Sequence, residues 1–202
     1  ACVGGKTGIN FLPYGKNILG RFAFPKQVII FTQWLNSLED RQLKSGLGEC
    51  LKHALLDPQK SLWPKVLSLS TQKAFQIDLG LLKQLVEVKS KIVHCDSMEH
   101  GVRATLNLGH TLAHALEAVS LVNHSKPALL HGEAVILGIV YSLFVASELK
   151  VWKGQDIKLK LEEMRNHNLI INVEDLSDLL GCNLSDSDLW VKLYELMAFD
   201  KK

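Results

Sequence analysis

The chain has 202 residues, of which 47% are hydrophobic and 22% are charged, and its formal net charge is +2. This composition is typical of a folded protein with an apolar core, and the balanced charge predicts no nucleic-acid partner. The four cysteines, at positions 2, 50, 95 and 182, lie too far apart for a thiolate zinc site or a disulfide framework. They favour free thiols in a reducing, cytoplasmic location.

The first 36 residues differ from the rest because glycine and proline divide them into short pieces. Short strands are predicted over 6–10 and 17–22, and a buried strand over the β-branched run 27–32. We interpret residues 1–36 as the end of an α/β unit. The absence of an initial Met and the start inside a glycine-rich turn suggest part of a larger protein.

Residues 37–202 show a helical pattern. Ser37 is predicted to cap a helix that ends at Asp57-Pro58. The apolar run 134–147, at 14 residues, is too short to cross a bilayer and predicts a core helix that is hydrophobic all round, so no membrane partner is expected. The predicted fold is mainly α, with short strands first. The further helices are expected over 61–68, 72–98, 103–121, 132–149, 155–167, 174–180 and 186–198.

Residues 103–117 form the most informative segment, because five polar side chains recur there at steps of four and three. They are Arg103, Asn107, His110, His114 and Glu117. On one continuous helix these side chains would line a single stripe. Two histidines one turn apart are unusual on a solvated face, so the stripe indicates either a chemical site or an atypical wet surface.

Candidate metal ligands occur in three places. His110 and His114 are one helical turn apart, His131 stands where the apolar helix begins, and Glu49 lies in a glycine-containing helical segment. Two imidazoles and one carboxylate, with a position left open, suit a catalytic zinc ion. Spacing alone favours His110 and His114 as the imidazole pair, and an ordinary core or capping histidine remains the alternative for each.

Basic residues next to glycines form a second set of candidates. Lys6 follows Gly4-Gly5, and Lys16 and Asn17 follow Gly15. Glycine lets a backbone approach an anion closely, and an adjacent ammonium neutralises it. Charged residues also recur near a predicted helix junction. A solvated helix face explains them as well as a functional site does. They are Lys89, Asp96, Glu99 and Arg103.

Together these segments resemble the dehydroquinate synthase family of the shikimate pathway. The motifs stand in the family's order over residues 1–150, and Asp200-Lys-Lys202 resembles a later element. They are Val3-Gly-Gly-Lys-Thr-Gly-Ile-Asn10, Gly15-Lys-Asn-Ile-Leu-Gly20, Gly46-Leu-Gly-Glu-Cys-Leu-Lys-His53, Lys89 with Glu99-His-Gly-Val-Arg103, Leu106-Asn-Leu-Gly-His-Thr-Leu-Ala-His-Ala-Leu-Glu117 and Leu130-His-Gly-Glu-Ala134. The resemblance implies a helical metal- and substrate-binding domain over 37–202, after the tail, over 1–36, of an NAD-binding α/β domain.

The resemblance also implies a role for each polar residue. Glu49, His110 and His131 match the family's metal ligands, so His131 takes the place that spacing gave to His114. Zinc is the expected metal, with cobalt as the alternative. His114 and Glu99 match positions of proton transfer, and Lys16 matches a contact of NAD. The substrate-contacting positions matched are Lys6, Asn17, Lys52, Lys89, Arg103, Asn107 and one of Lys201 or Lys202.

The activity implied is that of a phosphorus–oxygen lyase acting on a small anionic sugar phosphate, 3-deoxy-D-arabino-heptulosonate 7-phosphate, to give 3-dehydroquinate and phosphate. NAD⁺ oxidises a ring hydroxyl transiently, the metal polarises the carbonyl, phosphate leaves, and reduction and aldol cyclisation follow. A homodimer is also implied. Because the family's N-terminal NAD-binding domain is not among these residues, we expect the 202-residue chain to bind metal but to turn over little substrate.

Three rival interpretations stay open: another sugar-phosphate cyclase, a metal-dependent polyol dehydrogenase of related fold, and a helical metal-binding module without activity. Lys89 and Arg103 match contacts of the substrate carboxylate and favour dehydroquinate synthase. The sequence departs from the family pattern at Cys2, Phe31 and Ala113, none of which matches a metal ligand.

Overall fold

The computed structural model describes residues 3–11, 15–71, 77–123 and 127–199, with the backbone alone at 10, 11 and 15–18. Two strands come first, followed by helical elements of which η1 and η2 are 3-10 helices. The elements are β1 (Lys6–Phe11), β2 (Gly15–Phe22), η1 (Thr32–Ser37), α1 (Asp40–Leu56), α2 (Trp63–Leu69), α3 (Leu79–Cys95), η2 (Val102–Asn107), α4 (His110–Val122), α5 (His131–Glu148), α6 (Gly154–Asn166), α7 (Val173–Leu180) and α8 (Ser187–Ala198). The mainly α fold predicted from the sequence is confirmed.

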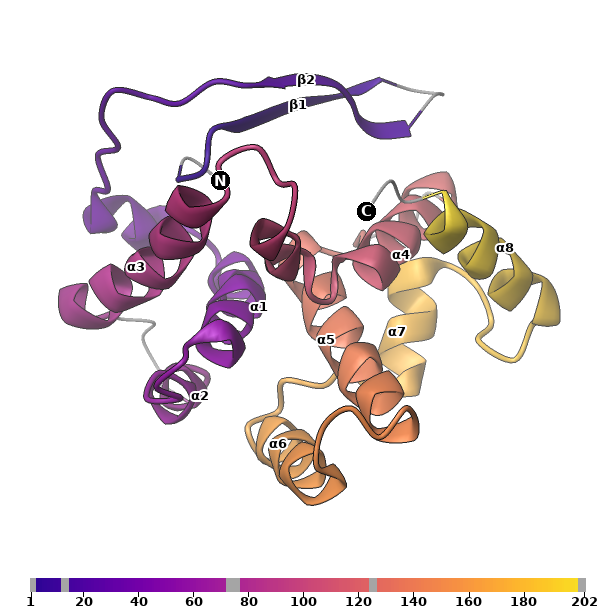
Figure 1. Cartoon of the computed structure of the whole chain (residues 1–202). Coiled ribbons are helices and arrows are strands. Elements are labelled where there is room, and N and C mark those ends of the chain that lie inside the picture. The colour runs from indigo at the N-terminus through magenta and orange to yellow at the C-terminus, as the bar shows by residue number, and fades with distance from the viewer. Residues whose placement is uncertain (1–2, 12–14, 72–76, 124–126, 200–202) are drawn as a thin grey trace.

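Helix α5 lies at the centre of the helical part, and the β1–β2 hairpin lies across one side of the molecule (Figure 1). α5 contacts α1, α4 and α6, while α2 and α3 pack on α1, and α7 and α8 pack on α4. The two predicted strands are present, and they pair as an antiparallel hairpin with Lys6 opposite Phe22. α1, α4 and α5 therefore form the frame on which other elements rest.

The core lies where these three helices meet. Leu47 and Leu51 of α1, Val119 of α4, and Val135 and Ile139 of α5 are at most 1% exposed. Burying an aliphatic side chain of this size completely contributes about 1.5–3 kcal/mol. The helices are held together mainly by this apolar contact, which fixes the relative positions of the polar residues they carry.

Helix α5 is, among the described residues, the one helix long and apolar enough by length and composition to span a membrane. The core helix of a soluble protein passes the same test. Residues Val135, Ile139 and Leu143 are buried in the common core, whereas Tyr141 and Phe144 are exposed. The prediction of a core helix is confirmed for the face that packs in the common core, while Tyr141 and Phe144 are left exposed by the described residues.

The start of α1 differs from the prediction. Ser37 does not cap this helix, because its hydroxyl donates instead to the Trp34 carbonyl in the preceding 3-10 helix. Glu39 is the N-cap residue and makes no side-chain capping bond. The other end is as predicted: α1 stops at Leu56, and the Asp57 carboxylate accepts hydrogen bonds from the following backbone. Helix α3 is shorter than the predicted 72–98, and residues 72–76 lie outside the described ranges.

The buried strand predicted over 27–32 is wrong. Residues 27–31 form no strand and pair with no other described segment, and η1 begins at Thr32. Ile29 is 76% exposed, and Val28, Ile30 and Phe31 are exposed as well. A β-branched run becomes a buried strand only where neighbouring strands and a covering layer are available. None of the described residues supplies them.

The single helix predicted over 103–121 is also wrong. The segment divides into η2 and α4, with Gly109 between them at a φ of +79°. This left-handed conformation is accessible to glycine at little cost and ends the helical path. The five-residue stripe is therefore split: Arg103 and Asn107 lie in η2, whereas His110, His114 and Glu117 lie in α4.

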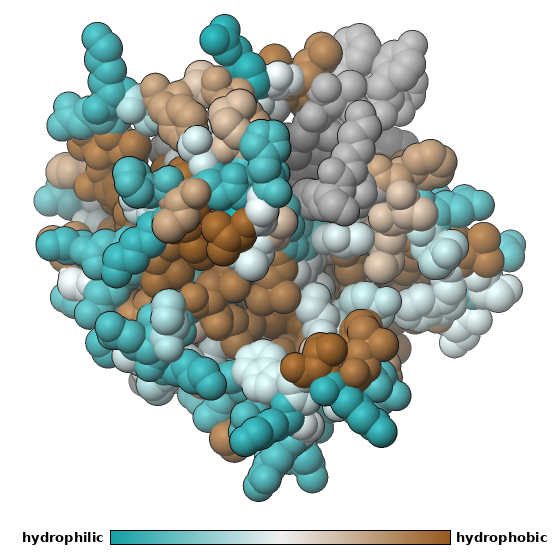
Figure 2. Space-filling model, in the orientation of Figure 1, coloured by the Kyte–Doolittle hydropathy of each residue, from teal (hydrophilic) through white to brown (hydrophobic). Residues whose placement is uncertain are grey.

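Hydrophobic residues are also visible on the surface. Figure 2 shows a broad hydrophobic area in the middle of the face drawn, bordered by hydrophilic side chains. Phe24, Trp34 and Leu38, in the segment that links the hairpin to α1, are among the exposed large apolar residues. The helical part buries a core but also exposes some apolar side chains, such as Phe144, and the N-terminal segment exposes apolar side chains without a buried core of its own among the described residues.

Candidate metal centre

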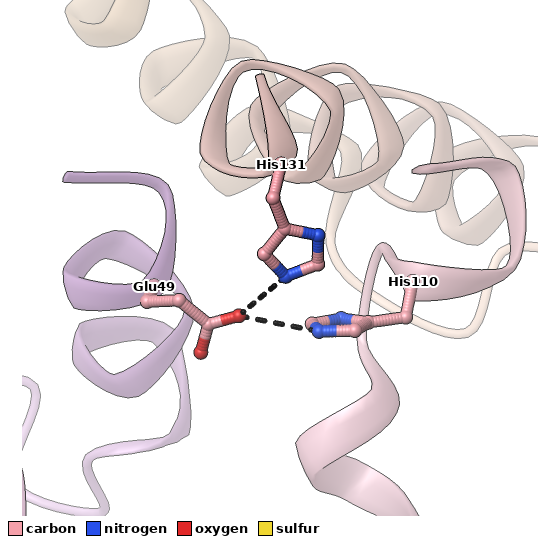
Figure 3. A group of neighbouring side chains, drawn as sticks. All are labelled: Glu49, His110 and His131. Atoms are coloured by element: carbon pink, nitrogen blue, oxygen red, sulfur yellow. Dashed lines mark ion pairs between the residues drawn. The ribbon is translucent and has the colours of Figure 1, made fainter. Parts of the chain in front are cut away.

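Three side chains that are remote in the sequence converge between α1, α4 and α5. Glu49, His110 and His131 point toward one another (Figure 3), with Glu49 Oε1 3.2 Å from His110 Nε2 and 3.4 Å from His131 Nε2. One potential ligand atom from each lies within 4.8 Å of the others. Zinc–ligand bonds of about 2.0–2.2 Å in a tetrahedron place neighbouring donors about 3.4 Å apart. The spacing therefore matches a divalent cation held by three protein ligands.

A close crossing of α1 and α5 positions Glu49 and His131. A Cβ atom on Gly48 would lie 2.3 Å from the Gly132 carbonyl oxygen, and one on Gly132 would lie 1.6 Å from the Ser45 carbonyl oxygen. Any larger residue would force α1 and α5 apart. Since Glu49 follows Gly48 and His131 precedes Gly132, the crossing brings their side chains within reach of one ion.

A second close contact positions His110. A Cβ atom on Gly138 would lie 1.8 Å from the carbonyl oxygen of Gly109, the residue that immediately precedes His110. The left-handed conformation of Gly109 turns the chain into α4 at this point. The start of α4 is thereby held against α5, and each candidate ligand stands next to a glycine that makes a backbone-to-backbone contact.

Polar contacts hold the start of α5 on α1. The Gly132 amide donates to Ser45 Oγ at 3.0 Å. The Arg41 guanidinium makes a bidentate pair with Glu133, with both N···O distances 2.7 Å. Glu133 also accepts from the Leu130 amide at the N-terminus of α5. These bonds resist sliding of α5 along α1, which would separate the candidate ligands.

Both imidazole rings are anchored through their Nδ1 atoms. His110 Nδ1 lies 3.2 Å from the Leu108 carbonyl oxygen. His131 Nδ1 lies 3.3 Å from each carboxylate oxygen of Glu117. Because these oxygens only accept hydrogen bonds, each Nδ1 carries the proton and each Nε2 faces Glu49.

The charges of the cluster are strongly coupled. Burial would raise the pKa of Glu49, but hydrogen bonds with His110 and His131 and the charge of Lys52 outweigh it and hold this pKa well below its usual range. Lys52 Nζ lies 2.7 Å from Glu49 Oε2. Hydrogen bonds with Glu117 and Glu49 raise the pKa of His131 to about 9. Glu49 is therefore ionised and able to bind a cation at neutral pH.

The donor set fits a divalent cation. Burial is the main cause of the lowered pKa of His110, so its neutral form is favoured. A neutral imidazole has one N–H, yet both His110 nitrogens face oxygens that accept, those of Leu108 and Glu49. A cation between Nε2 and Glu49 Oε1 would satisfy both groups, since each would then donate a lone pair to it.

His114 lies one turn further along α4. Its ring centroid is 5.5 Å from that of His110 and 6.3 Å from that of His131. Among the described residues, the group of potential ligands within 4.8 Å of one another contains His131 and not His114. The pair favoured by spacing alone is therefore not the one that the fold brings together with Glu49.

A second polar cluster contains Lys6, Glu99 and Asn107. Lys6 forms an ion pair with Glu99 Oε2, and Asn107 Nδ2 donates to Glu99 Oε1 at 2.9 Å. Burial would raise the pKa of Glu99, but these two contacts outweigh it and lower this pKa. Glu99 also adopts a φ of +64°, which is uncommon outside glycine. The loop before η2 thus presents an ionised carboxylate.

Arg103 is only 2% exposed, and its guanidinium is used by the backbone. It donates to the carbonyl oxygens of Gly4 and Ser97, each at 2.5 Å, and lies 5.1 Å from the Phe22 ring centroid. Its Nε has no partner among the described residues. Arg103 therefore joins η2 to the glycine turn before β1, and the Lys89 side chain lies against the same turn.

The remaining predicted residues lie where their side chains are not described. Lys16 and Asn17 belong to β2, for which only the backbone is described at these positions, and Lys201 and Lys202 fall outside the described ranges. The sequence reasoning did not assign two features of the site. Glu117 was noted in the stripe but had no role, and the Arg41–Glu133 pair left no signal in the local pattern.

Comparisons with known proteins identify the family of the chain. The model of the 3-dehydroquinate synthase C-terminal part matches residues 46–202, and that of the N-terminal part matches residues 1–45. The chain is 40% identical to a 3-dehydroquinate synthase of Bacillus pumilus, over 75% of this chain and 44% of that protein. It is 39% identical to one of Legionella pneumophila, over 100% of this chain and 51% of that protein.

A third relative, a bifunctional 3-dehydroquinate synthase/phosphatase of Fusobacterium nucleatum, is 39% identical over the whole chain, which spans 28% of that protein. The chain thus covers about half or less of each of these relatives.

Solved structures of similar fold include a 2-deoxy-scyllo-inosose synthase in complex with carbaglucose-6-phosphate, NAD⁺ and Co²⁺. It matches 99% of this chain and 51% of its own, with a TM-score of 0.68 and 21% identity. A 2-epi-5-epi-valiolone synthase of Streptomyces hygroscopicus with NAD⁺ and Zn²⁺ bound matches 98% of this chain over 62% of its own length, with a TM-score of 0.62 and 22% identity. These likenesses concern the fold, and the family models decide the membership: the chain belongs to the 3-dehydroquinate synthase family.

Proposed function

We propose that this chain is the metal- and substrate-binding part of a 3-dehydroquinate synthase, a phosphorus–oxygen lyase of the shikimate pathway. The observation that carries the proposal is the convergence of Glu49, His110 and His131 on one point in a chain of this family. We assign the activity to a longer protein, because the chain spans only 28–51% of the length of these relatives. The division into residues 1–36 and 37–202 is part of the proposal.

The cofactors proposed are NAD and one divalent metal, with zinc first and cobalt second. Solved structures of similar fold carry NAD⁺ with Co²⁺ or Zn²⁺. Glu49, His110 and His131 would hold the metal, which when bound supplies a Lewis acid for a substrate carbonyl. Lys16 is proposed to contact NAD.

The substrate proposed is 3-deoxy-D-arabino-heptulosonate 7-phosphate, whose carboxylate and phosphate call for several cations. Lys52, 4% exposed at its side chain and paired with Glu49, would neutralise charge next to the metal centre. Lys6, held by Glu99, would present its ammonium nearby. The other proposed contacts are Asn17, Lys89, Arg103, Asn107 and one of Lys201 or Lys202.

Proton transfer is proposed for His114 and Glu99. His114 stands one turn from His110 and beside both histidine ligands, so its imidazole can hold a proton next to a leaving phosphate. Glu99 is ionised, because its pKa is lowered, and it can accept a proton. A homodimer and a cytoplasmic location complete the proposal.

The metal centre is tested by replacing His131 with Ala and measuring bound zinc after dialysis. The variant is expected to lose its metal, since two remaining ligands hold zinc far more weakly than three. His94→Ala, at the end of α3 and outside the cluster, is the matched control and should keep its metal. Full metal occupancy in His131→Ala would refute the assignment.

The role of His114 is tested in the complete enzyme. His114→Ala should keep the metal but release phosphate more slowly, by about 10²–10⁴-fold if general acid–base catalysis is lost. Phosphate release and metal content are measured on the same sample. Unchanged release would contradict the role.

The substrate is tested by offering the complete enzyme the heptulosonate phosphate and glucose 6-phosphate in parallel. We expect the enzyme to cyclise the heptulosonate phosphate and not glucose 6-phosphate. Turnover of glucose 6-phosphate instead would favour another sugar-phosphate cyclase, and hydride transfer without phosphate loss would favour a polyol dehydrogenase.

A further inference from the structure

Glu117 has no part in the roles proposed above, although it lies beside the metal centre. It belongs to α4, and its side chain is only 10% exposed. Both carboxylate oxygens lie 3.3 Å from His131 Nδ1, on the side of the ring opposite to Glu49. A buried carboxylate is costly unless it is paired and hydrogen-bonded, so the placement of Glu117 next to an imidazole has a physical purpose.

The contact decides which nitrogen of His131 carries the proton. A carboxylate only accepts hydrogen bonds, so His131 Nδ1 must donate. The lone pair of the neutral ring then lies on Nε2, the atom that faces Glu49. Without the carboxylate, the proton can occupy either nitrogen and the ring can turn, because 42% of the His131 side chain is exposed.

The other imidazole does not depend on a side chain in this way. His110 Nδ1 contacts the backbone carbonyl of Leu108, and only 12% of the His110 side chain is exposed. The orientation of His110 is thus fixed by the fold itself. The orientation of His131, the first residue of α5, depends instead on a single side chain of another helix, Glu117 of α4.

We propose that Glu117 is the positioning residue of the metal centre: through His131 Nδ1 it fixes the tautomer and the ring orientation that present Nε2 to the metal. The inference rests on the metal ligands proposed above. Carboxylates that hold a metal-bound histidine in this manner raise the basicity of the ligand, and their loss costs about 10–100-fold in metal affinity.

The test is a zinc titration of the purified protein, first stripped with a chelator and then titrated against a chromophoric competitor. Glu117→Gln keeps the size of the side chain and is expected to weaken zinc binding about tenfold, and Glu117→Ala about a hundredfold. Glu162→Gln makes the same chemical change on the exposed surface of α6 and should bind zinc within twofold of wild type. Zinc affinities of both Glu117 variants within twofold of wild type would overturn the inference.

A spectroscopic measurement separates positioning from a merely structural role. With ¹⁵N-labelled histidine, NMR of the zinc-loaded protein should show His131 protonated at Nδ1. The metal-free Glu117→Ala variant should show both tautomers of this ring. If Glu117→Ala does not fold, the spectrum of the zinc-loaded wild type still decides, because a neutral His131 that carries its proton on Nε2 and binds zinc through Nδ1 would overturn the inference.

The two proposals fail in different ways. If the wild type does not bind zinc, or if His131→Ala binds it equally well, the metal centre itself is wrong. If the wild type binds zinc, His131→Ala does not, and the Glu117 variants match the wild type, only the positioning role is wrong.

Discussion

The helical frame and the N-terminal segment contain similar apolar residues but treat them differently. In α1, α4 and α5, side chains such as Leu51, Val119 and Ile139 are completely buried, whereas Ile29 and Trp34 of the N-terminal segment are 76% and 71% exposed. The helices present apolar faces to one another within the chain. The segment 27–31 has no such partner among the described residues. Burial is therefore decided by what the rest of the molecule offers, and residue type alone does not predict it.

The same contrast applies to the polar residues. In the helical frame, Glu49, His110 and His131 are held by backbone contacts at glycines next to them. The N-terminal segment contacts the polar residues around η2 through two interactions. Lys6 forms an ion pair with Glu99, and the Gly4 carbonyl oxygen accepts a hydrogen bond from Arg103. The metal centre is thus built into the core, and the contribution of the N-terminal segment depends on a few polar bonds.

The largest expected difference between the two regions is in the cost of shortening an apolar side chain. Leu51→Ala should lower the free energy of unfolding by about 2–5 kcal/mol, because it leaves a cavity in the core. Ile29→Ala should change it by less than about 0.5 kcal/mol, because this side chain is exposed. Urea unfolding followed by circular dichroism measures both.

Equal costs for these two changes would break the comparison. Such a result would mean that residues 27–31 are covered in solution, for instance by another copy of the chain. Repeating the measurement at two protein concentrations would show whether a second copy is involved.

A smaller effect is expected from a methyl group placed at the helix crossing. Gly48→Ala should destabilise the protein by about 1–3 kcal/mol, because the added Cβ would meet the Gly132 carbonyl oxygen at 2.3 Å. It should also weaken zinc binding, since α1 and α5 must separate. Gly46→Ala lies two residues away on α1 with nothing within 4 Å of its Cβ, and should stabilise by up to about 1 kcal/mol. If both variants were equally stable, the crossing would not depend on glycine.

The last expected effect concerns pH. Burial, followed by the charge of Lys52, lowers the pKa of His53 to about 4 from 6.5. The neutral form is favoured in the folded protein, so its contribution to stability is complete above pH 6.5 and is lost as the pH falls toward 4, by at most about 1.4 kcal/mol per pH unit. His53→Gln removes this titration. The free energy of unfolding should therefore fall less between pH 7 and pH 5 in the variant than in the wild type, and equal falls would contradict the effect.

Local patterns predicted much of the fold. Periodic apolar residues and the stop at Asp57-Pro58 predicted α1 and most later helices within a few residues, and the glycine-rich pieces predicted the two strands. The patterns failed where contacts between residues far apart in the sequence determine the local structure. They could not show that Gly109 packs on α5 and splits the helix predicted over 103–121, or that the run 27–32 finds no strand to pair with.

The candidate ligands could be named from the sequence only through the resemblance to a family. Helical spacing favoured His110 and His114, because residues four apart share a face whatever the fold. His131, and not His114, lies with Glu49 and His110 because α5 crosses α1 and α4, and no local sequence pattern contains this crossing. The Arg41–Glu133 pair, which joins residues 92 positions apart, was missed for the same reason.

What the sequence determined by itself is the set of chemical groups and the helices that carry them, because propensity and periodicity act between residues a few positions apart. The tertiary structure alone decided which of these groups meet: glycine contacts bring α1, α4 and α5 close enough for one carboxylate and two imidazoles to share an ion. Glu117 gained its partner His131 in the same way. Such contacts depend on the packing of complete helices, which forms only when the whole core is buried.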